Sequence, residues 1–249
     1  MSERNFELEQ RDNSQRLYRY GIDNIVRDMF LDRISQSEFK LRSNSKVLEI
    51  GSHDGSMTTQ ILAYVDKIDV LEPVVELHQQ IKEAVGENVN IFSGTIESAE
   101  FDQKYDAIFL VHVLEHIDSP IDALKRISHW LKPTGFLYVM VPNANALSRQ
   151  LAQTMGLMGA TTDVLPGEKL QGHLRTYTLE HLVTDVTQAS LKVTETGGIL
   201  HKPLANFQLD RCIEEEIIGQ EYLNALDDYA KTNPKEASSI FVVASSEIR

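Results

Sequence analysis

The sequence predicts an α/β fold in which helices cover both faces of a mostly parallel sheet. Between residues 46 and 143, short apolar runs alternate with segments in which apolar residues recur at helical spacing. The apolar runs are continuous, as in strands that are buried on both faces. Such alternation implies right-handed strand–helix–strand crossovers, which align the strands in parallel. The 249 residues, of which 42% are hydrophobic, suffice for one large domain.

The individual elements follow in order along the chain. Strands are predicted over residues 46–50, 67–71, 90–93, 106–113 and 136–141, and helices over 58–65, 73–85 and 119–131. Pro73 suits a first helical turn and Gly86 suits the end of that helix, while Ser119 and Pro120 suit a cap and a first turn. In the last third, helices are predicted over 145–158, 178–189 and 210–231, a loop over 159–172, and strands over 191–196 and 240–244. Near the N-terminus, apolar residues in 15–39 also recur at helical spacing.

The composition argues against several classes of protein. The formal net charge is −13, and phosphate backbones repel such a surface, so we expect no nucleic acid as a partner. The single cysteine, Cys212, cannot form an internal disulfide or a cysteine-rich metal site, and we expect no metal ion. The first residues are polar, and no apolar stretch approaches the roughly 20 residues that span a bilayer. We therefore expect a cytoplasmic protein without membrane insertion; no motif indicates its oligomeric state.

The turn after the first predicted strand, residues 49–55, has the features of a nucleotide-binding turn. Gly51 and Gly55 lack Cβ atoms, so the backbone can approach a ligand closely. A dinucleotide-binding G-x-G-x-x-G pattern would need glycine where His53 and Ser56 stand, and no phosphate-binding G-x-x-x-x-G-K-[ST] loop occurs. The carboxylate of Glu49 would repel a pyrophosphate but attract a sulfonium or ammonium group. The turn therefore favours S-adenosylmethionine over a dinucleotide.

Three further segments follow the next predicted strands. Glu72 ends the second strand, 21 residues after Gly51, where an acidic side chain can accept both ribose hydroxyls in this type of sheet. The alternative for Glu72 is a solvated residue at a helix N-terminus. Residues 94–97 (GTIE) can contact an adenine edge after the third strand, and residues 111–118 (VHVLEHID) follow the fourth.

These segments resemble the class I S-adenosylmethionine-dependent methyltransferases. VLEIGSHDGS, DVLEP, FSGTIES, YDAIFLVHVLEHIDSP and LKPTGFLYVMVPN occur in that family's order and spacing, and HLRTYTLEHL and IFVVASSE resemble its later segments. The chain looks most like the small-molecule group that includes the ubiquinone-biosynthesis O-methyltransferases. The resemblance implies a doubly wound Rossmann-like sheet of seven strands, mostly parallel with an antiparallel last strand, plus helical lid elements. It implies one domain over 1–249, with an N-terminal helical segment (1–40), a cofactor-binding core (46–143) and substrate-side elements (144–249).

The resemblance also implies roles for individual residues. Glu49 and Gly51 would line the methionine part of S-adenosylmethionine, Glu72 would hold the ribose, and the backbone of Val111 would contact the cofactor. Thr95 and Ile96 would flank the adenine. The expected cofactor-binding set is Glu49, Gly51, Ser52, His53, Gly55, Glu72, Pro73, Thr95, Ile96, Val111 and His116. Two positions depart from the family pattern: His53 replaces the middle glycine of the turn, and Thr95 replaces an acidic residue.

A general base is needed only if the methyl acceptor must lose a proton. The candidates are His112, His116 and His173, with Tyr177 nearby in the sequence. We expect His112 and His173 to be catalytic, with His112 facing the pocket if the fourth strand alternates regularly. The alternatives are a hydrogen bond from His116 that braces the loop, and a packing role for His173.

The leading hypothesis is methyl transfer to a small-molecule acceptor, with O-methylation favoured and N- and C-methylation open. A non-catalytic cofactor- or partner-binding protein of the same fold is the alternative, and the missing glycines disfavour a nicotinamide oxidoreductase. Residues 145–158 and an N-terminal helix with Arg16, Tyr18, Arg19 and Tyr20 could form a lid. For residues 145–158, ordinary core packing is the other interpretation.

Overall fold

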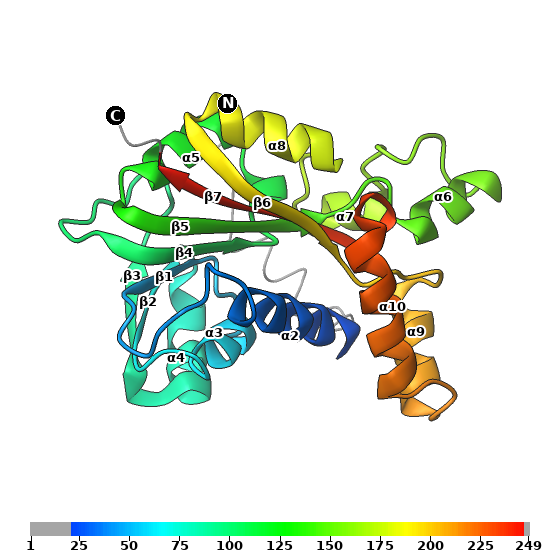
Figure 1. Ribbon diagram of the computed structural model, residues 1–249, viewed down its shortest axis with the longest axis horizontal. Coiled ribbons are helices and arrows are strands. Elements are labelled where there is room, and N and C mark those ends of the chain that lie inside the picture. The colour runs from blue at the N-terminus through cyan, green and yellow to red at the C-terminus, as the bar shows by residue number, and fades with distance from the viewer. Residues whose placement is uncertain (1–20, 247–249) are drawn as a thin grey trace.

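The computed structural model describes residues 21–246, so the predicted lid residues between 16 and 20 lie outside the described part of the chain. Seven strands form one sheet in the order β3-β2-β1-β4-β5-β7-β6 (Figure 1). The strands are β1 (Val47–Ile50), β2 (Ile68–Glu72), β3 (Val89–Ser93), β4 (Tyr105–Val111), β5 (Leu131–Pro142), β6 (Leu191–Ile199) and β7 (Ser239–Ser246). Strand β7 is antiparallel to both β5 and β6, and the other neighbouring strands pair in parallel. The predicted sheet is thereby confirmed.

Helices cover both faces of this sheet (Figure 1). They are α2 (Gly21–Ser35), α3 (Ser56–Ile61), α4 (Val75–Val85), α5 (Pro120–Ser128), α6 (Leu147–Thr154), α7 (Pro166–Leu170), α8 (Leu179–Gln188), α9 (Asn206–Glu214) and α10 (Gln220–Thr232). Buried residues of α2, α3, α4, α9 and α10 share one hydrophobic core, and those of α5 and α8 share another. The single-turn helix η2 (Leu114–His116) follows β4.

Alternation along the strands divides side chains between the two cores. Val47 and Phe109 belong to the core beneath α2, whereas Leu48 and Ile108 belong to the core beneath α5 and α8. Successive residues of a strand point to opposite faces, so a strand that is apolar at every position supplies both cores. This arrangement explains why the central strands read as continuous apolar runs.

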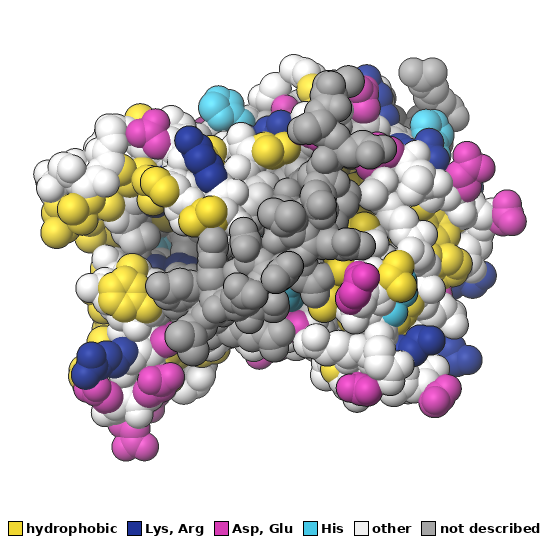
Figure 2. All heavy atoms as spheres, turned by 180° about the vertical axis from the view of Figure 1, so that it is seen from behind, with side chains coloured by type: hydrophobic (Ala, Val, Ile, Leu, Met, Phe, Trp, Pro, Cys, Tyr) yellow, Lys and Arg dark blue, Asp and Glu magenta, His cyan; other side chains and the backbone are white. Residues whose placement is uncertain are grey.

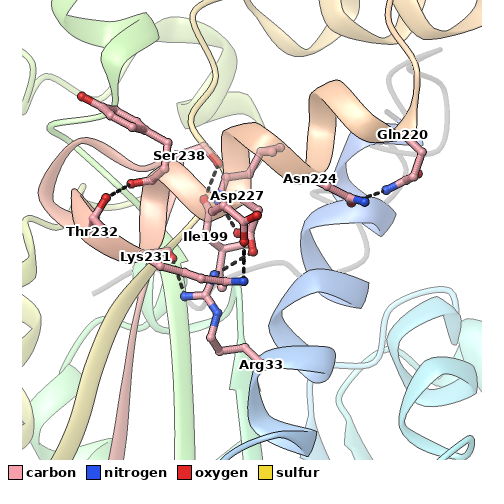
Figure 3. A network of polar contacts seen from close by, with 12 residues as sticks. Arg33, Ile199, Gln220, Asn224, Asp227, Lys231, Thr232 and Ser238 are labelled. Carbon is pink, nitrogen blue, oxygen red and sulfur yellow. Dashed lines mark hydrogen bonds and ion pairs between the residues drawn. The ribbon is translucent and has the colours of Figure 1, made fainter.

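A partly buried ion pair joins α10 to α2, and its two side chains also contact the end of β6 (Figure 3). Arg33 Nη2 lies 2.7 Å from Asp227 Oδ2, and the two side chains are 15% and 10% exposed. Arg33 Nη1 also donates to the carbonyl of Gly198 at 3.1 Å, and Leu200 N–H donates to Asp227 Oδ1 at 3.0 Å. These contacts fix α10 against the sheet although it lies far from α2 in sequence.

Several predicted boundaries were wrong. Strand β4 ends at Val111 rather than residue 113, and the first helix after β1 spans 56–61 rather than 58–65. The predicted helix 210–231 is two helices, α9 and α10, separated near Glu216, whose φ is 55°. The predicted loop 159–172 contains α7, and α6 is shorter than predicted. Among residues 21–246, no helix has the length and apolar character needed to cross a lipid bilayer.

Candidate active site

A cavity of about 800 Å³ lies beyond the carboxyl ends of β1, β2, β3 and β4. This edge is where ligands bind in open α/β sheets. Its lining includes these predicted site residues: Gly51, His53, Glu72, Pro73, Thr95, Ile96, His112 and His116. Segments that are remote in sequence therefore meet around one space, because parallel strands all end at the same edge of the sheet.

The turn after β1 brings backbone close to the loop after β4. Gly51 has a φ of 78°, and a Cβ added there would lie 2.7 Å from Val113 Cγ2. Any side chain at this position would clash, so only glycine fits. His53 is also in the left-handed region, with a φ of 53°, which a non-glycine residue rarely adopts. This is the position at which the family pattern has glycine, and the backbone of His53 keeps the conformation that glycine would favour.

Glu72 is fixed at the wall of the cavity by backbone donors. The residue is 4% exposed, and its carboxylate accepts hydrogen bonds from His53 N–H and Val74 N–H, each at 3.0 Å. Burial raises the pKa of Glu72, and the two backbone hydrogen bonds oppose that rise. The side chain is therefore held by two different loops while it still borders the cavity.

Glu49 lies beneath the turn and does not line the cavity. It is 3% exposed, and Thr58 Oγ1 donates to its Oε2 at 2.5 Å. Burial raises the pKa of Glu49 to about 7. Ser52 is buried beside it, with its Oγ 2.5 Å from Thr58 Oγ1. Like Glu49 and Ser52, three further predicted site residues do not line the cavity: Gly55, Val111 and His173.

Histidines surround a buried carboxylate after β4. Glu115, in η2, is 1% exposed, and its Oε1 lies 3.6 Å from His112 Nδ1 and 4.0 Å from His116 Nε2. His112 has a φ of 55°, and its N–H donates to the carbonyl of Met140 at 2.8 Å. Burial disfavours ionisation of Glu115, but His112, His116 and His173 outweigh it and leave its pKa below the usual value.

A segment remote in sequence brings His173 to this group. Leu174 N–H donates to the carbonyl of Glu115 at 3.0 Å, while Arg175 donates to the carbonyl of Ile117 and, at 3.1 Å, to that of Asp118. The His173 ring meets the His116 ring edge to face, with centroids 4.7 Å apart. Burial lowers the pKa of His173, against the opposing effect of Glu115. The three histidines are thus held around one acid.

Sequence reasoning missed two members of this site. Glu115 was not singled out, although the spacing H-x-x-E-H after a predicted strand was a signal that could have revealed it. Gln171 lines the cavity beside α7, and it had no such signal because residues 159–172 were interpreted as a loop.

Comparison with known proteins agrees with this geometry. Residues 18–196 match the methyltransferase domain family. A ubiquinone biosynthesis O-methyltransferase from Rickettsia conorii is 22% identical over 183 residues, which cover 69% of this chain and 61% of that protein. The match thus spans less than two thirds of that relative's length.

Two solved structures share the fold. The N-methyltransferase NodS from Bradyrhizobium japonicum, in complex with S-adenosyl-L-homocysteine, has a TM-score of 0.60 at 13% identity, covering 97% of this chain and 96% of that one. The [4+2]-cyclase SpnF has a TM-score of 0.60 at 15% identity, covering 89% of this chain and 82% of that one. At these identities the likeness is one of fold. The chain belongs to the methyltransferase domain family and is a class I S-adenosylmethionine-dependent methyltransferase.

Proposed function

We propose that this enzyme methylates a hydroxyl group of a small-molecule acceptor inside the cavity. The observation that supports this proposal is that one continuous cavity is lined both by Glu72, after β2, and by His112 and His116, after β4. A cofactor and an acceptor bound in the same space could be brought into near-attack geometry, which supplies much of the rate in such a transfer.

The cofactor side of the cavity fits S-adenosylmethionine. Gly51 leaves open a space that a Cβ would fill, so backbone there can contact the methionine part. We propose that Glu72, which lines the cavity, accepts hydrogen bonds from the ribose hydroxyls and that Thr95 and Ile96 flank the adenine. When bound, S-adenosylmethionine supplies an electrophilic methyl group on a sulfonium. Glu49 would stabilise the sulfonium and ammonium charges of S-adenosylmethionine from behind the turn. Ser52, Gly55 and Val111 would support the local structure of the site rather than contact the cofactor.

The acceptor side carries the groups for handling a proton. Glu115 Oε1 lies 3.6 Å from Nδ1 of His112, beyond hydrogen-bonding distance, and a small approach on substrate binding would let it orient the ring and leave the other nitrogen for the acceptor hydroxyl. His112 would then accept the proton that a hydroxyl loses on methylation. Cofactor binding alone needs no such group, so these side chains favour catalysis over the non-catalytic alternative. The O-methyltransferase name of the Rickettsia conorii relative favours a hydroxyl acceptor.

His112→Ala and His173→Ala test the acceptor side. We expect turnover to fall about 100-fold for His112→Ala and at least about tenfold for His173→Ala, while the affinity for S-adenosylhomocysteine stays unchanged. The measurements are methyl transfer to a panel of hydroxylated and amine metabolites, and calorimetric titration of the demethylated cofactor. His181→Ala is the matched control, because His181 is exposed on α8. Full turnover in both variants, or methylation of amines in preference to hydroxyls, would contradict the proposal.

A further inference from the structure

Two buried hydroxyl groups lie next to the carboxylate of Glu49, at the turn after β1. Thr58 Oγ1 donates to Glu49 Oε2 at 2.5 Å, and Ser52 Oγ lies 2.5 Å from Thr58 Oγ1. Thr58 is 0% exposed, and Ser52 and Glu49 are each 3% exposed. A hydroxyl has one proton to donate. Since the proton of Thr58 goes to Glu49, Ser52 donates to Thr58, and the two hydroxyls form a chain that ends on the carboxylate.

The side chain of Thr58 is used differently from that of its neighbour in α3. Thr59 is exposed, and its hydroxyl donates to the carbonyl of Gly55 at 2.9 Å, four residues earlier. Threonine commonly makes this local bond within a helix. Thr58 instead donates to a side chain nine residues earlier, in β1. Because threonine is β-branched and this residue is buried, few rotamers are open to it, and its hydroxyl is committed to Glu49.

The charge of Glu49 depends on several groups that surround it. Burial raises the pKa of Glu49 to about 7. The hydrogen bond from Thr58 is the largest influence in the opposite direction, ahead of the charge of Arg27 in α2. Glu72, at the end of β2, and Asp54, in the turn, add to the rise. Without the Thr58 hydroxyl, Glu49 would be mostly protonated, and so uncharged, near neutral pH.

A charge at Glu49 matters because S-adenosylmethionine carries a sulfonium that S-adenosylhomocysteine lacks. Glu49 does not line the cavity, but Ile50 and Gly51, which follow it directly, do. Across so short a separation in a medium of low dielectric, an anion attracts a cation without touching it. Ionised Glu49 would therefore favour the methyl donor over the demethylated product.

We propose that Thr58 is a positioning residue that holds Glu49 as an anion behind the turn, and that this anion makes the site prefer S-adenosylmethionine to S-adenosylhomocysteine. Thr58 acts through Glu49, and Ser52 supports it by donating to its oxygen. Once the methyl group has been transferred, the product has lost its sulfonium and is held less tightly. The proposal rests on the proposed placement of the cofactor against the turn after β1, but not on the identity of the acceptor.

Calorimetric titration of the full chain with each of the two ligands, from about pH 6 to about pH 9, tests the proposal. In the wild-type protein we expect the affinity for S-adenosylmethionine to rise about tenfold as Glu49 ionises, and that for S-adenosylhomocysteine to rise about threefold or less.

Thr58→Val keeps the shape of the side chain but lacks the hydroxyl. At about pH 7.5 it should bind S-adenosylmethionine about tenfold more weakly, with the rise in affinity moved to higher pH. Thr58→Ser keeps the hydroxyl and should restore the wild-type values. Thr59→Val, at the exposed neighbouring position of α3, is the matched control and should bind both ligands as the wild type does.

Two further variants test the other members of the chain. Glu49→Gln has no titratable group at this position, so its affinity for S-adenosylmethionine should not change between about pH 6 and about pH 9. Ser52→Ala removes the outer hydroxyl and should lower the preference for S-adenosylmethionine about threefold. This variant keeps the proposal testable even if Thr58→Val does not fold.

Equal losses for the two ligands in Thr58→Val, with the pH dependence of the wild type retained, would overturn the proposal, because Thr58 would then act only through packing. A preference that is unchanged in Ser52→Ala would also overturn it, as would a wild-type affinity for S-adenosylmethionine that does not vary with pH. The expected dependence on Thr58 in a protein that methylates no hydroxyl acceptor would support this proposal and count only against the proposed function.

Discussion

At the scale of single residues, Glu49 is buried at the end of β1, next to the turn that is proposed to bind the cofactor. Thr58 Oγ1 donates a hydrogen bond to its carboxylate at 2.5 Å, and burial raises its pKa to about 7. An unfolded glutamate titrates near 4.3, so between these two values the folded protein binds a proton that the unfolded chain does not. Stability is therefore fully present below the unfolded value and is lost as pH rises through about 7.

Glu49→Gln removes this pH dependence. The amide oxygen can still accept from Thr58, so we expect little change at pH 4 and a variant more stable than the wild type at pH 8–9. The expected gain is on the order of 3 kcal/mol in the free energy of unfolding, measured by urea unfolding of cofactor-free protein. A wild-type protein whose stability rises between pH 5 and 8 relative to the variant would contradict this assignment.

Some site residues could be predicted from the sequence, and others depend on tertiary contacts. Glu72 was predictable because its strand end is visible as an apolar run followed by proline. His112 does line the cavity, but β4 ends one residue earlier and His112 lies at a φ of 55°, not in a regular strand. Glu115 was missed because its surroundings include His173, which the fold brings from a distant segment. No local pattern records that contact.

At the scale of elements, the two-sided helical cover was predictable, and the later helices were not. Residues 210–231 keep helical periodicity throughout, yet the chain breaks between α9 and α10 and resumes after Gly219. Asp210 in α9 accepts from the first amides of α2, Gly21 N–H at 2.9 Å and Ile22 N–H at 2.8 Å. Asp227 in α10 pairs with Arg33 of α2. Each helix thus meets α2 separately, a tertiary requirement that periodicity does not reveal.

The contact between α10 and α2 gives a prediction at this scale. Asp227→Ala removes the ion pair with Arg33 and the acceptor for Leu200 N–H (Figure 3). We expect the free energy of unfolding to fall by about 3 kcal/mol, measured by urea unfolding. The neighbouring Asp228→Ala should leave stability nearly unchanged, because Asp228 is exposed and pairs only with Lys231 among the contacts described. Equal losses in the two variants would show that the ion pair does not fix α10.

At the scale of the whole molecule, the charge of the surface agrees with the proposed small acceptor better than with a polyanion. The formal net charge is −13, and Figure 2 shows acidic and basic side chains interspersed on the visible face, without a continuous basic area among the coloured residues. Phosphate backbones bind where lysine and arginine gather. The cavity, by contrast, offers about 800 Å³, within the range of sites for small ligands.

The proposed cofactor site is the cavity at the strand ends, with Glu72 as the residue that recognises S-adenosylmethionine. Calorimetric titration with S-adenosylhomocysteine tests this site, using wild-type protein, Glu72→Gln, and Glu76→Gln as the matched control on the exposed side of α4. We predict one site per chain, no binding of NAD, and a loss of at least about tenfold for Glu72→Gln alone, because a hydrogen bond to a charged group contributes about 1.5–3 kcal/mol. Wild-type affinity in Glu72→Gln would show that Glu72 does not recognise the cofactor, and competition by NAD would show that the cavity is not specific for S-adenosylmethionine.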